Sequence, residues 1–127
     1  MSVFDASALL ALARQEPGAA IVAQKLSTGH VSAINASEFV QKIRQYGDDG
    51  VKAFEALEQL GLTLHPVNRE DAYATALLYE AGKPYGLSLA DRACLALARR
   101  LSAEVLTADT LWLKIASELK LEIKLIR

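Results

Sequence analysis

The chain has 127 residues, of which 52% are hydrophobic and 23% are charged, a composition typical of a folded protein rather than of a disordered segment. This length predicts a single domain over residues 1–127, and the one cysteine excludes an internal disulfide. Fourteen Lys and Arg residues against 15 Asp and Glu residues give a net charge of −1, so no overall positive field attracts a polyanion and any nucleic-acid contact must be local.

Short hydrophobic runs alternate with longer amphipathic stretches along the chain, which predicts strands separated by helices. In the first half we expect strands at residues 3–4, 30–32 and 62–67, and helices over residues 6–14, 19–26, 35–46 and 51–60. Residues Asn35 to Glu38 have the spacing of a capping box, so the helix after the second strand is expected to start there.

In the second half, helices are expected over residues 68–82, 88–100 and 110–119, and strands at residues 104–106 and 121–125. The last strand alternates between apolar and polar residues, as a half-exposed edge strand does. The order of elements predicts an α/β fold of three layers: a parallel sheet of about five strands, four short ones plus a C-terminal edge strand, with helices on both faces.

No hydrophobic run approaches the roughly 20 residues that span a bilayer, and the N-terminal segment has no basic leader. We therefore expect a cytoplasmic protein that does not associate with a membrane. Cys94 falls on the apolar face of a helix, and we expect it to be a core thiol. His30 and His65 are expected to be packed or surface side chains.

Four acidic residues follow short hydrophobic runs near the predicted starts of helices: Asp5, Glu38, Asp91 and Asp109. In an open α/β sheet, such positions converge on the crevice beyond the C-terminal ends of the strands. Each acid taken alone could simply cap a helix, because carboxylates accept hydrogen bonds from free backbone N–H groups. Their number and common position favour a divalent-metal site instead.

Clustered carboxylates specify both the ion and its chemistry. If they converge to about 4 Å, each pair repels by roughly 4 kcal/mol at an effective dielectric constant near 20, which a bound cation would relieve. Oxygen ligands without Cys or His select Mg²⁺ or Mn²⁺ rather than zinc. Such an ion favours phosphodiester hydrolysis, because it lowers the pKa of the attacking water and neutralises charge on the phosphate and the leaving oxygen.

Other chemistries lack their signatures in this chain. There is no GxxxxGK[ST] loop, GxSxG elbow, CxxC pair, HExxH helix or GxGxxG turn after a strand. A response-regulator receiver has a similar five-stranded architecture, but it needs paired acids after its first strand and an acid after its third. Here Asp5 stands alone, and the third predicted strand supplies no acid.

Several segments resemble the PIN-domain ribonucleases, in particular the VapC toxins of type II toxin–antitoxin modules. They are VFDASALL at residues 3–10, the helix that contains Glu38, GLSLADRACLALA at residues 86–98 and VLTADTLW at residues 105–112. The first motif is short and apolar, whereas the last two are much more specific. The match covers the whole chain in order, and all four acids of the family are present.

The resemblance implies that Asp5, Glu38, Asp91 and Asp109 are the catalytic, metal-binding acids, with Mg²⁺ or Mn²⁺ as the cofactor. Ser7 and Thr107 match hydroxyl residues that flank these acids and would hydrogen-bond to carboxylates or metal-bound water, although capping or turn roles are equally consistent with their positions.

The resemblance also implies an activity and partners. The chain would be an endoribonuclease toxin that cleaves structured RNA such as tRNA or rRNA. A cognate VapB-like antitoxin would neutralise it by placing a basic side chain at the acids, and the basic unit would be a homodimer.

Side chains near the acids have less specific signals. Arg92, next to Asp91, is a candidate phosphate contact, as are further basic residues on the predicted helices: Arg14, Lys42, Arg44, Arg99 and Arg100. Charged residues on helices are, however, usually part of a solvated face. Trp112 could stack on a base but is expected to lie in the core.

Two other functions remain open on the sequence. The same metal site could serve a DNA or flap nuclease. Alternatively, the chain could be a non-catalytic module that binds a partner, with the acids serving only as helix caps.

Overall fold

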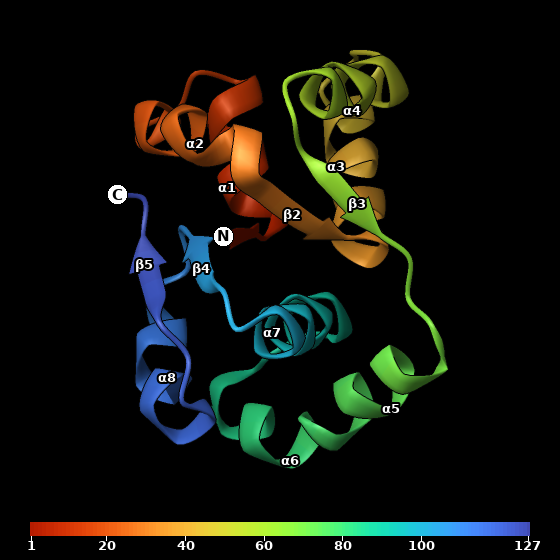
Figure 1. The fold of residues 1–127 in the computed structure, drawn as a ribbon. Helices are drawn as coiled ribbons and strands as arrows, with labels where there is room; N and C mark the ends of the chain where they lie inside the picture. The colour runs from red at the N-terminus through yellow and green to blue at the C-terminus, as the bar shows by residue number, and fades with distance from the viewer.

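A computed structural model describes residues 1–127 and confirms the predicted α/β architecture. All neighbouring strands in the five-stranded sheet are parallel, in the order β3-β2-β1-β4-β5 (Figure 1). The strands are β1 (Ser2–Phe4), β2 (Gly29–Ser32), β3 (Thr63–His65), β4 (Glu104–Thr107) and β5 (Ile123–Leu125). The C-terminal strand lies at an edge of the sheet, as its alternating pattern predicted.

Helices cover both faces of the sheet (Figure 1). One layer contains α1 (Ala6–Ala13), α2 (Ala19–Lys25), α3 (Ala33–Gln45) and α4 (Gly50–Gln59). The other contains α5 (Arg69–Leu77), α6 (Tyr79–Gly82), α7 (Leu89–Leu101) and α8 (Leu113–Leu119). The chain also contains three short 3₁₀ helices, η1 (Leu26–Thr28), η2 (Lys83–Tyr85) and η3 (Thr110–Trp112).

The core is divided between the two faces because side chains alternate along a strand. Phe4 of β1 and Leu106 of β4 belong to the hydrophobic cluster formed with α1 to α4. Val3 and Val105, one residue earlier on the same strands, belong to the cluster formed with α7 and α8. Cys94 is fully buried in this second cluster, as predicted. The sheet is therefore buried on both sides, as expected for a parallel sheet.

The strand order creates a topological switch point between β1 and β4. From β1 the chain builds outward through β2 to β3, and it then returns to place β4 on the other side of β1. Crossovers therefore leave the C-terminal ends of β1 and β4 in opposite directions, which opens the crevice where ligands bind in sheets of this kind. Asp5 directly follows β1, and Asp109 lies two residues beyond β4.

Helix α3 begins earlier than the sequence pattern predicted. Its N-cap is Ser32, whose Oγ accepts a hydrogen bond of 3.3 Å from the backbone N of Ile34. The predicted start at Asn35 to Glu38 is therefore wrong, because both residues lie inside the helix. Asn35 is 1% exposed and donates from Nδ2 to the carbonyl oxygen of Ala90, at 3.0 Å. Asn35 thus makes a tertiary contact with α7 rather than capping the helix.

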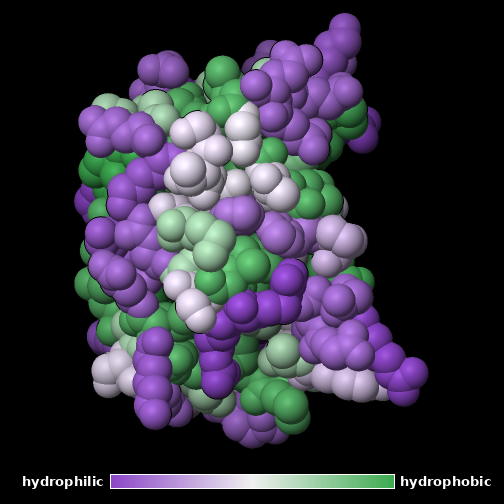
Figure 2. Space-filling view, in the orientation of Figure 1, coloured by the Kyte–Doolittle hydropathy of each residue, from purple (hydrophilic) through white to green (hydrophobic).

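The surface in the orientation of Figure 2 mixes hydrophilic and hydrophobic residues, and neither kind covers the whole face. No helix is both long enough and apolar enough to cross a lipid bilayer. His30 and His65 are partly buried and contact each other across β2 and β3, with 2.8 Å between Nδ1 of His30 and Nε2 of His65. Burial lowers the pKa of both imidazoles.

Candidate metal centre

All four predicted acids line one cavity of about 300 Å³ at the switch point. Asp5 is the N-cap of α1, Glu38 lies inside α3, Asp91 lies in the first turn of α7, and Asp109 caps η3. Acids up to 104 positions apart in the sequence, Asp5 and Asp109, thus share a single surface hollow. The predicted convergence of the four acids on one crevice is what the fold produces.

Asp5 is the most deeply buried of the four, with 6% of its surface exposed. Its Oδ1 accepts hydrogen bonds from Ser7 Oγ at 2.7 Å and from the backbone N of Ala8 at 2.9 Å. Its Oδ2 accepts a hydrogen bond of 2.6 Å from Thr107 Oγ1. Both oxygens are therefore fixed by donors from β4 and α1, so the orientation of this carboxylate is set before any ligand arrives.

The two hydroxyl groups also tie the carboxylate to the loop after β4. Ser7 Oγ accepts a hydrogen bond from the backbone N of Ala108, and Thr107 Oγ1 accepts one from the backbone N of Asp109, each at 3.0 Å. Each hydroxyl thus donates to Asp5 and accepts from the chain that positions Asp109. This hydrogen-bond network links Asp5 to the backbone that positions Asp109, on either side of the switch point.

Asp91 and Asp109 cap helices with one oxygen each. Asp91 Oδ2 accepts from the backbone N of Ser88 at 2.9 Å, completing a capping box, and Asp109 Oδ1 accepts from the backbone N of Leu111 at 3.0 Å. Their second oxygens accept no hydrogen bond from the chain. Glu38 differs from the other three, because neither of its oxygens has a hydrogen-bond or ion-pair partner within the chain. Capping therefore explains three of the acids but not Glu38.

The electrostatics of the cavity disfavour several negative charges at once. Burial raises the pKa of Asp5 to about 6, against the lowering effect of its hydrogen bonds, and the charge of Asp91 adds to the rise. Burial and the charge of Asp91 also raise the pKa of Glu38. Burial raises the pKa of Asp91 too, with a contribution from Asp109 and against its capping bonds. The negative charges in the cavity thus repel one another, and a cation would relieve the repulsion.

The donor set fits a hard divalent cation. The cavity offers carboxylate oxygens, and four of these, on Glu38, Asp91 and Asp109, accept no hydrogen bond from the chain. No Cys or His side chain lines the cavity. Such oxygens match Mg²⁺ or Mn²⁺. No three of these side chains are placed to hold an ion as they stand, so ion binding would draw the side chains together.

Basic and aromatic side chains form the other end of the same cavity. Arg14 and Lys42 are among the candidate phosphate contacts from the sequence, whereas the sequence did not predict that they would lie together with Tyr46. Arg14 and Tyr46 stack on each other, with 3.4 Å from the Arg14 Cζ atom to the Tyr46 ring centroid. Lys42 lies one helical turn beyond Glu38, and Glu16 and Arg127 complete the lining. A clustering of this kind leaves no local sequence signal, because its members come from α1, α3 and the C-terminal segment.

Arg92 does not line the cavity, although it is adjacent to Asp91 in the sequence. Its Nη1 donates to the carbonyl oxygen of Thr75 at 2.9 Å, and its guanidinium lies 5.4 Å from the ring centroid of Tyr79. Successive residues on a helix point in different directions, which turns Arg92 toward α5 and α6. Trp112 is fully buried, in agreement with a core role.

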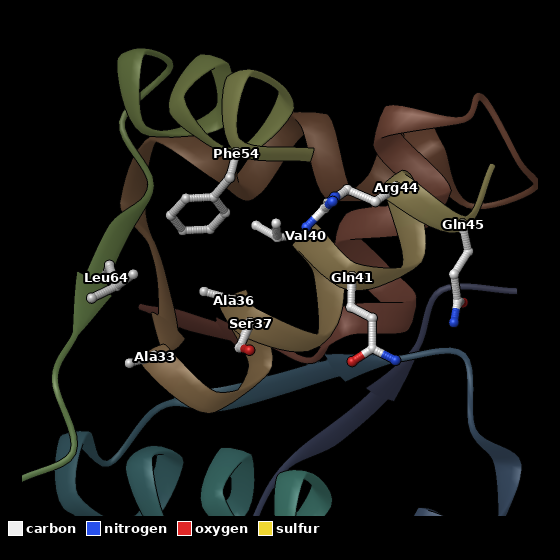
Figure 3. A pocket seen from close by; sticks show the side chains of 9 residues that line it. All are labelled: Ala33, Ala36, Ser37, Val40, Gln41, Arg44, Gln45, Phe54 and Leu64. Carbon is white, nitrogen blue, oxygen red and sulfur yellow. The ribbon is translucent and has the colours of Figure 1, made fainter. Parts of the chain in front are cut away.

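A larger and more apolar groove, of about 750 Å³, lies on another side of α3. Figure 3 shows Phe54 of α4 and Leu64 of β3 facing the apolar side chains of α3 across this groove. Its lining comprises Ala33, Ala36, Ser37, Val40, Gln41, Arg44, Gln45, Phe54 and Leu64. Helix α3 therefore presents Glu38 and Lys42 to the acidic cavity and Ser37 and Val40 to the groove.

Solved structures with the same fold come from several organisms. A toxin–antitoxin complex from Klebsiella pneumoniae aligns with a TM-score of 0.70 and 21% identity, over 87% of this chain and 88% of that one. FitAcB from Neisseria gonorrhoeae aligns with a TM-score of 0.69 and 20% identity, over 97% and 96%. VapBC-1 from nontypeable Haemophilus influenzae aligns with a TM-score of 0.68 and 17% identity, over 98% and 97%.

At identities this low, the structural matches show that the fold is shared. No curated protein matches the chain by sequence. The family model of the PIN domain matches residues 2–118, which include all four acids and every strand except β5. On this match the chain belongs to the PIN domain family.

Proposed function

We propose that the chain is a metal-dependent endoribonuclease and acts as a VapC-type toxin on structured RNA such as tRNA or rRNA. The observation that carries this proposal is the convergence of Asp5, Glu38, Asp91 and Asp109 on one cavity at the switch point. Membership of the PIN domain family supports a nuclease. The toxin–antitoxin complexes among the structural neighbours support the toxin role.

The four acids would hold Mg²⁺ or Mn²⁺. When bound, the ion would supply a Lewis acid that polarises the scissile phosphate and lowers the pKa of the attacking water. Ser7 and Thr107 fix both oxygens of Asp5, so this carboxylate needs no reorganisation on substrate binding. Glu38 has both oxygens free of protein donors and a raised pKa, properties that suit it to orient the water or accept its proton.

The test is cleavage of purified tRNA and rRNA with Mg²⁺ or Mn²⁺, followed by mapping of the cleavage ends. We expect discrete ends that disappear with a chelator and return when excess Mn²⁺ is added. Single-stranded DNA at a matched concentration is the comparison, and preferential cleavage of DNA would favour the alternative DNA or flap nuclease. If Mn²⁺ neither binds nor raises the melting temperature, the acids are only helix caps, because a ligand that binds the folded state must stabilise it.

We further propose that a VapB-like antitoxin neutralises the chain and that the basic unit is a homodimer. The apolar groove between α3, α4 and β3 is the surface best suited to an apolar segment of the antitoxin. Because α3 borders both the groove and the acids, a segment in the groove could continue to the acidic cavity and place a basic side chain there. Leu77 on α5 is 79% exposed and offers apolar surface for a dimer.

Substitution of Ser37 by Arg is expected to weaken binding of the proposed VapB-like antitoxin by at least tenfold. Ser37 is exposed and lines the groove, so a long charged side chain would fill it without disturbing the core. Ala56→Arg, at an exposed position of α4 outside the groove, is the matched control. Calorimetry of the two complexes measures the effect, and light scattering reports the oligomeric state. Equal affinities for the two variants would place the antitoxin elsewhere.

A further inference from the structure

The cavity that contains the acids has a second, chemically different end. Helices α1 and α3 pack against each other, and both run from an acid toward basic or aromatic residues. Helix α1 leads from Asp5 to Arg14, and α3 leads from Glu38 through Lys42 to Tyr46. At a rise of about 1.5 Å per residue, Lys42 lies about 6 Å and Tyr46 about 12 Å beyond Glu38 along the helix axis.

We propose that Arg14, Lys42 and Tyr46 form a subsite for a nucleotide that flanks the scissile phosphate. This inference rests on the proposed ribonuclease function and adds the residues that bind the RNA strand next to the acids. The phosphate of the flanking nucleotide contacts Lys42 and Arg14, and its base stacks on the Arg14–Tyr46 pair. The subsite therefore selects an unpaired nucleotide, because a base within a helix already stacks on its neighbours.

The Arg14–Tyr46 pair has the form of a stacking platform. The guanidinium lies over the ring, with Cζ 3.4 Å from the ring centroid, and Glu16 Oε2 lies 3.5 Å from Arg14 Nη1. Tyr46 is 55% exposed and Arg14 is also exposed, so the pair presents planar surface to solvent at the edge of the cavity. Sites for single-stranded nucleic acid combine such planes with cations.

Lys42 is the cation in this cavity that remains free to contact a phosphate. It is exposed and makes no hydrogen bond or ion pair within the chain, whereas Arg127 donates to the carbonyl oxygen of Pro17 at 3.0 Å and lies 3.9 Å from Glu16. A phosphate next to the scissile one would meet repulsion from the acids unless a cation lay beside it. Lys42, one turn from Glu38, supplies that cation.

The test uses a single-stranded oligoribonucleotide that contains the cleavage site, with variants at both parts of the subsite. Tyr46→Ala should raise KM about tenfold, because loss of one base stack costs on the order of 1.4 kcal/mol, while Tyr46→Phe should behave as the wild type. Lys42→Gln should reduce the slope of log affinity against log salt by about 0.7, the value for one phosphate contact on a single strand. A substrate that is abasic at the flanking position should remove the difference between Tyr46→Ala and the wild type.

The chain contains a matched control for the stacked pair. Arg69 and Tyr73 form a similar pair on α5, with the Arg69 Cζ atom 5.5 Å from the ring centroid and a hydrogen bond of 2.9 Å from Arg69 Nε to Tyr73 Oη. Tyr73→Ala should leave KM unchanged. If Tyr46→Ala changes only the melting temperature, the pair merely joins the ends of α1 and α3, and the subsite proposal is overturned.

Fluorescence anisotropy of the labelled oligoribonucleotide separates this inference from the proposed function. If the wild type cleaves RNA and the Tyr46 and Lys42 variants have unchanged KM and salt dependence, the subsite is wrong and the nuclease stands. If the wild type binds RNA without cleaving it and the variants bind more weakly, the subsite stands and the nuclease is wrong. Unchanged RNA binding with weaker antitoxin binding would assign the surface to the protein partner and overturn the subsite.

Discussion

Asp5→Asn is expected to raise the free energy of unfolding of the metal-free protein by about 1 to 2 kcal/mol at pH 7.5 and to abolish RNA cleavage. Burial raises the pKa of Asp5 from 3.8 to about 6, even though three hydrogen bonds favour the ionised form. Each unit of pKa shift corresponds to about 1.4 kcal/mol. The ionised carboxylate therefore destabilises the metal-free fold at neutral pH, and a neutral amide of the same shape removes that cost. The amide Nδ2 cannot accept the hydrogen bond that Thr107 Oγ1 donates to Oδ2, and this loss offsets about 1 kcal/mol of the gain.

The sign of the effect fixes its pH dependence. Because the folded-state pKa of Asp5 lies above the unfolded value, the folded protein holds the proton over a pH range in which the unfolded chain has lost it. The contribution of Asp5 to stability is therefore most favourable below about pH 4 and falls as pH rises to about 6. The advantage of the Asn variant should be absent near pH 3.5 and complete above pH 7.

Urea unfolding in the presence of a chelator, from pH 3.5 to 8, measures this difference. Asp49→Asn is the control, because Asp49 caps α4 at an exposed position where Asn caps equally well. Added Mn²⁺ should stabilise the wild type and leave Asp5→Asn unchanged. A variant less stable than the wild type at pH 7.5 would contradict the burial cost, and retained cleavage would remove Asp5 from the catalytic acids.

The sequence predicted those parts of the site that depend on short-range pattern. Asp5 and Asp109 could be placed because each follows, within two residues, a hydrophobic run that forms a strand at the switch point. Asp91 could be placed because it lies near the start of the helix expected over residues 88–100, and in the structure Ser88 and Asp91 form a capping box there. For these acids, the residue that caps the start of a helix is also the residue that lies at the crevice. Both interpretations of the sequence therefore predict the same position.

The remaining parts depend on which face of a helix meets which neighbour, and local pattern does not specify this. The capping box predicted at Asn35 to Glu38 is wrong, because the side chain of Asn35 lies against α7 and that of Glu38 lies in the cavity. Adjacency to Asp91 suggested a phosphate contact for Arg92, but its guanidinium binds the Thr75 carbonyl. The Arg14–Tyr46 stack joins residues 32 positions apart, so only the packing of α1 on α3 reveals it.

Glu38→Gln should reduce kcat/KM for RNA by at least 100-fold without lowering the free energy of unfolding. Loss of a general base or of a metal-binding oxygen costs about 10²- to 10⁴-fold in rate. Stability should not fall, because no group of the chain hydrogen-bonds to the Glu38 carboxylate. Burial and the charge of Asp91 raise its pKa, so the neutral amide is tolerated at least as well as the ionised acid.

This substitution separates metal binding from capping, which substitutions of the other three acids cannot do. Asp5, Asp91 and Asp109 each accept a hydrogen bond from a backbone N–H at a helix start, so their replacement mixes loss of a cap with loss of a ligand. RNA cleavage kinetics, thermal melting and Mn²⁺ titration should be measured on Glu38→Gln beside Glu55→Gln, an exposed position on α4. Full cleavage and unchanged Mn²⁺ affinity in Glu38→Gln would remove Glu38 from the metal-binding and catalytic acids. Lost cleavage in a protein of undiminished stability would instead show that Glu38 serves the reaction and contributes nothing to the fold.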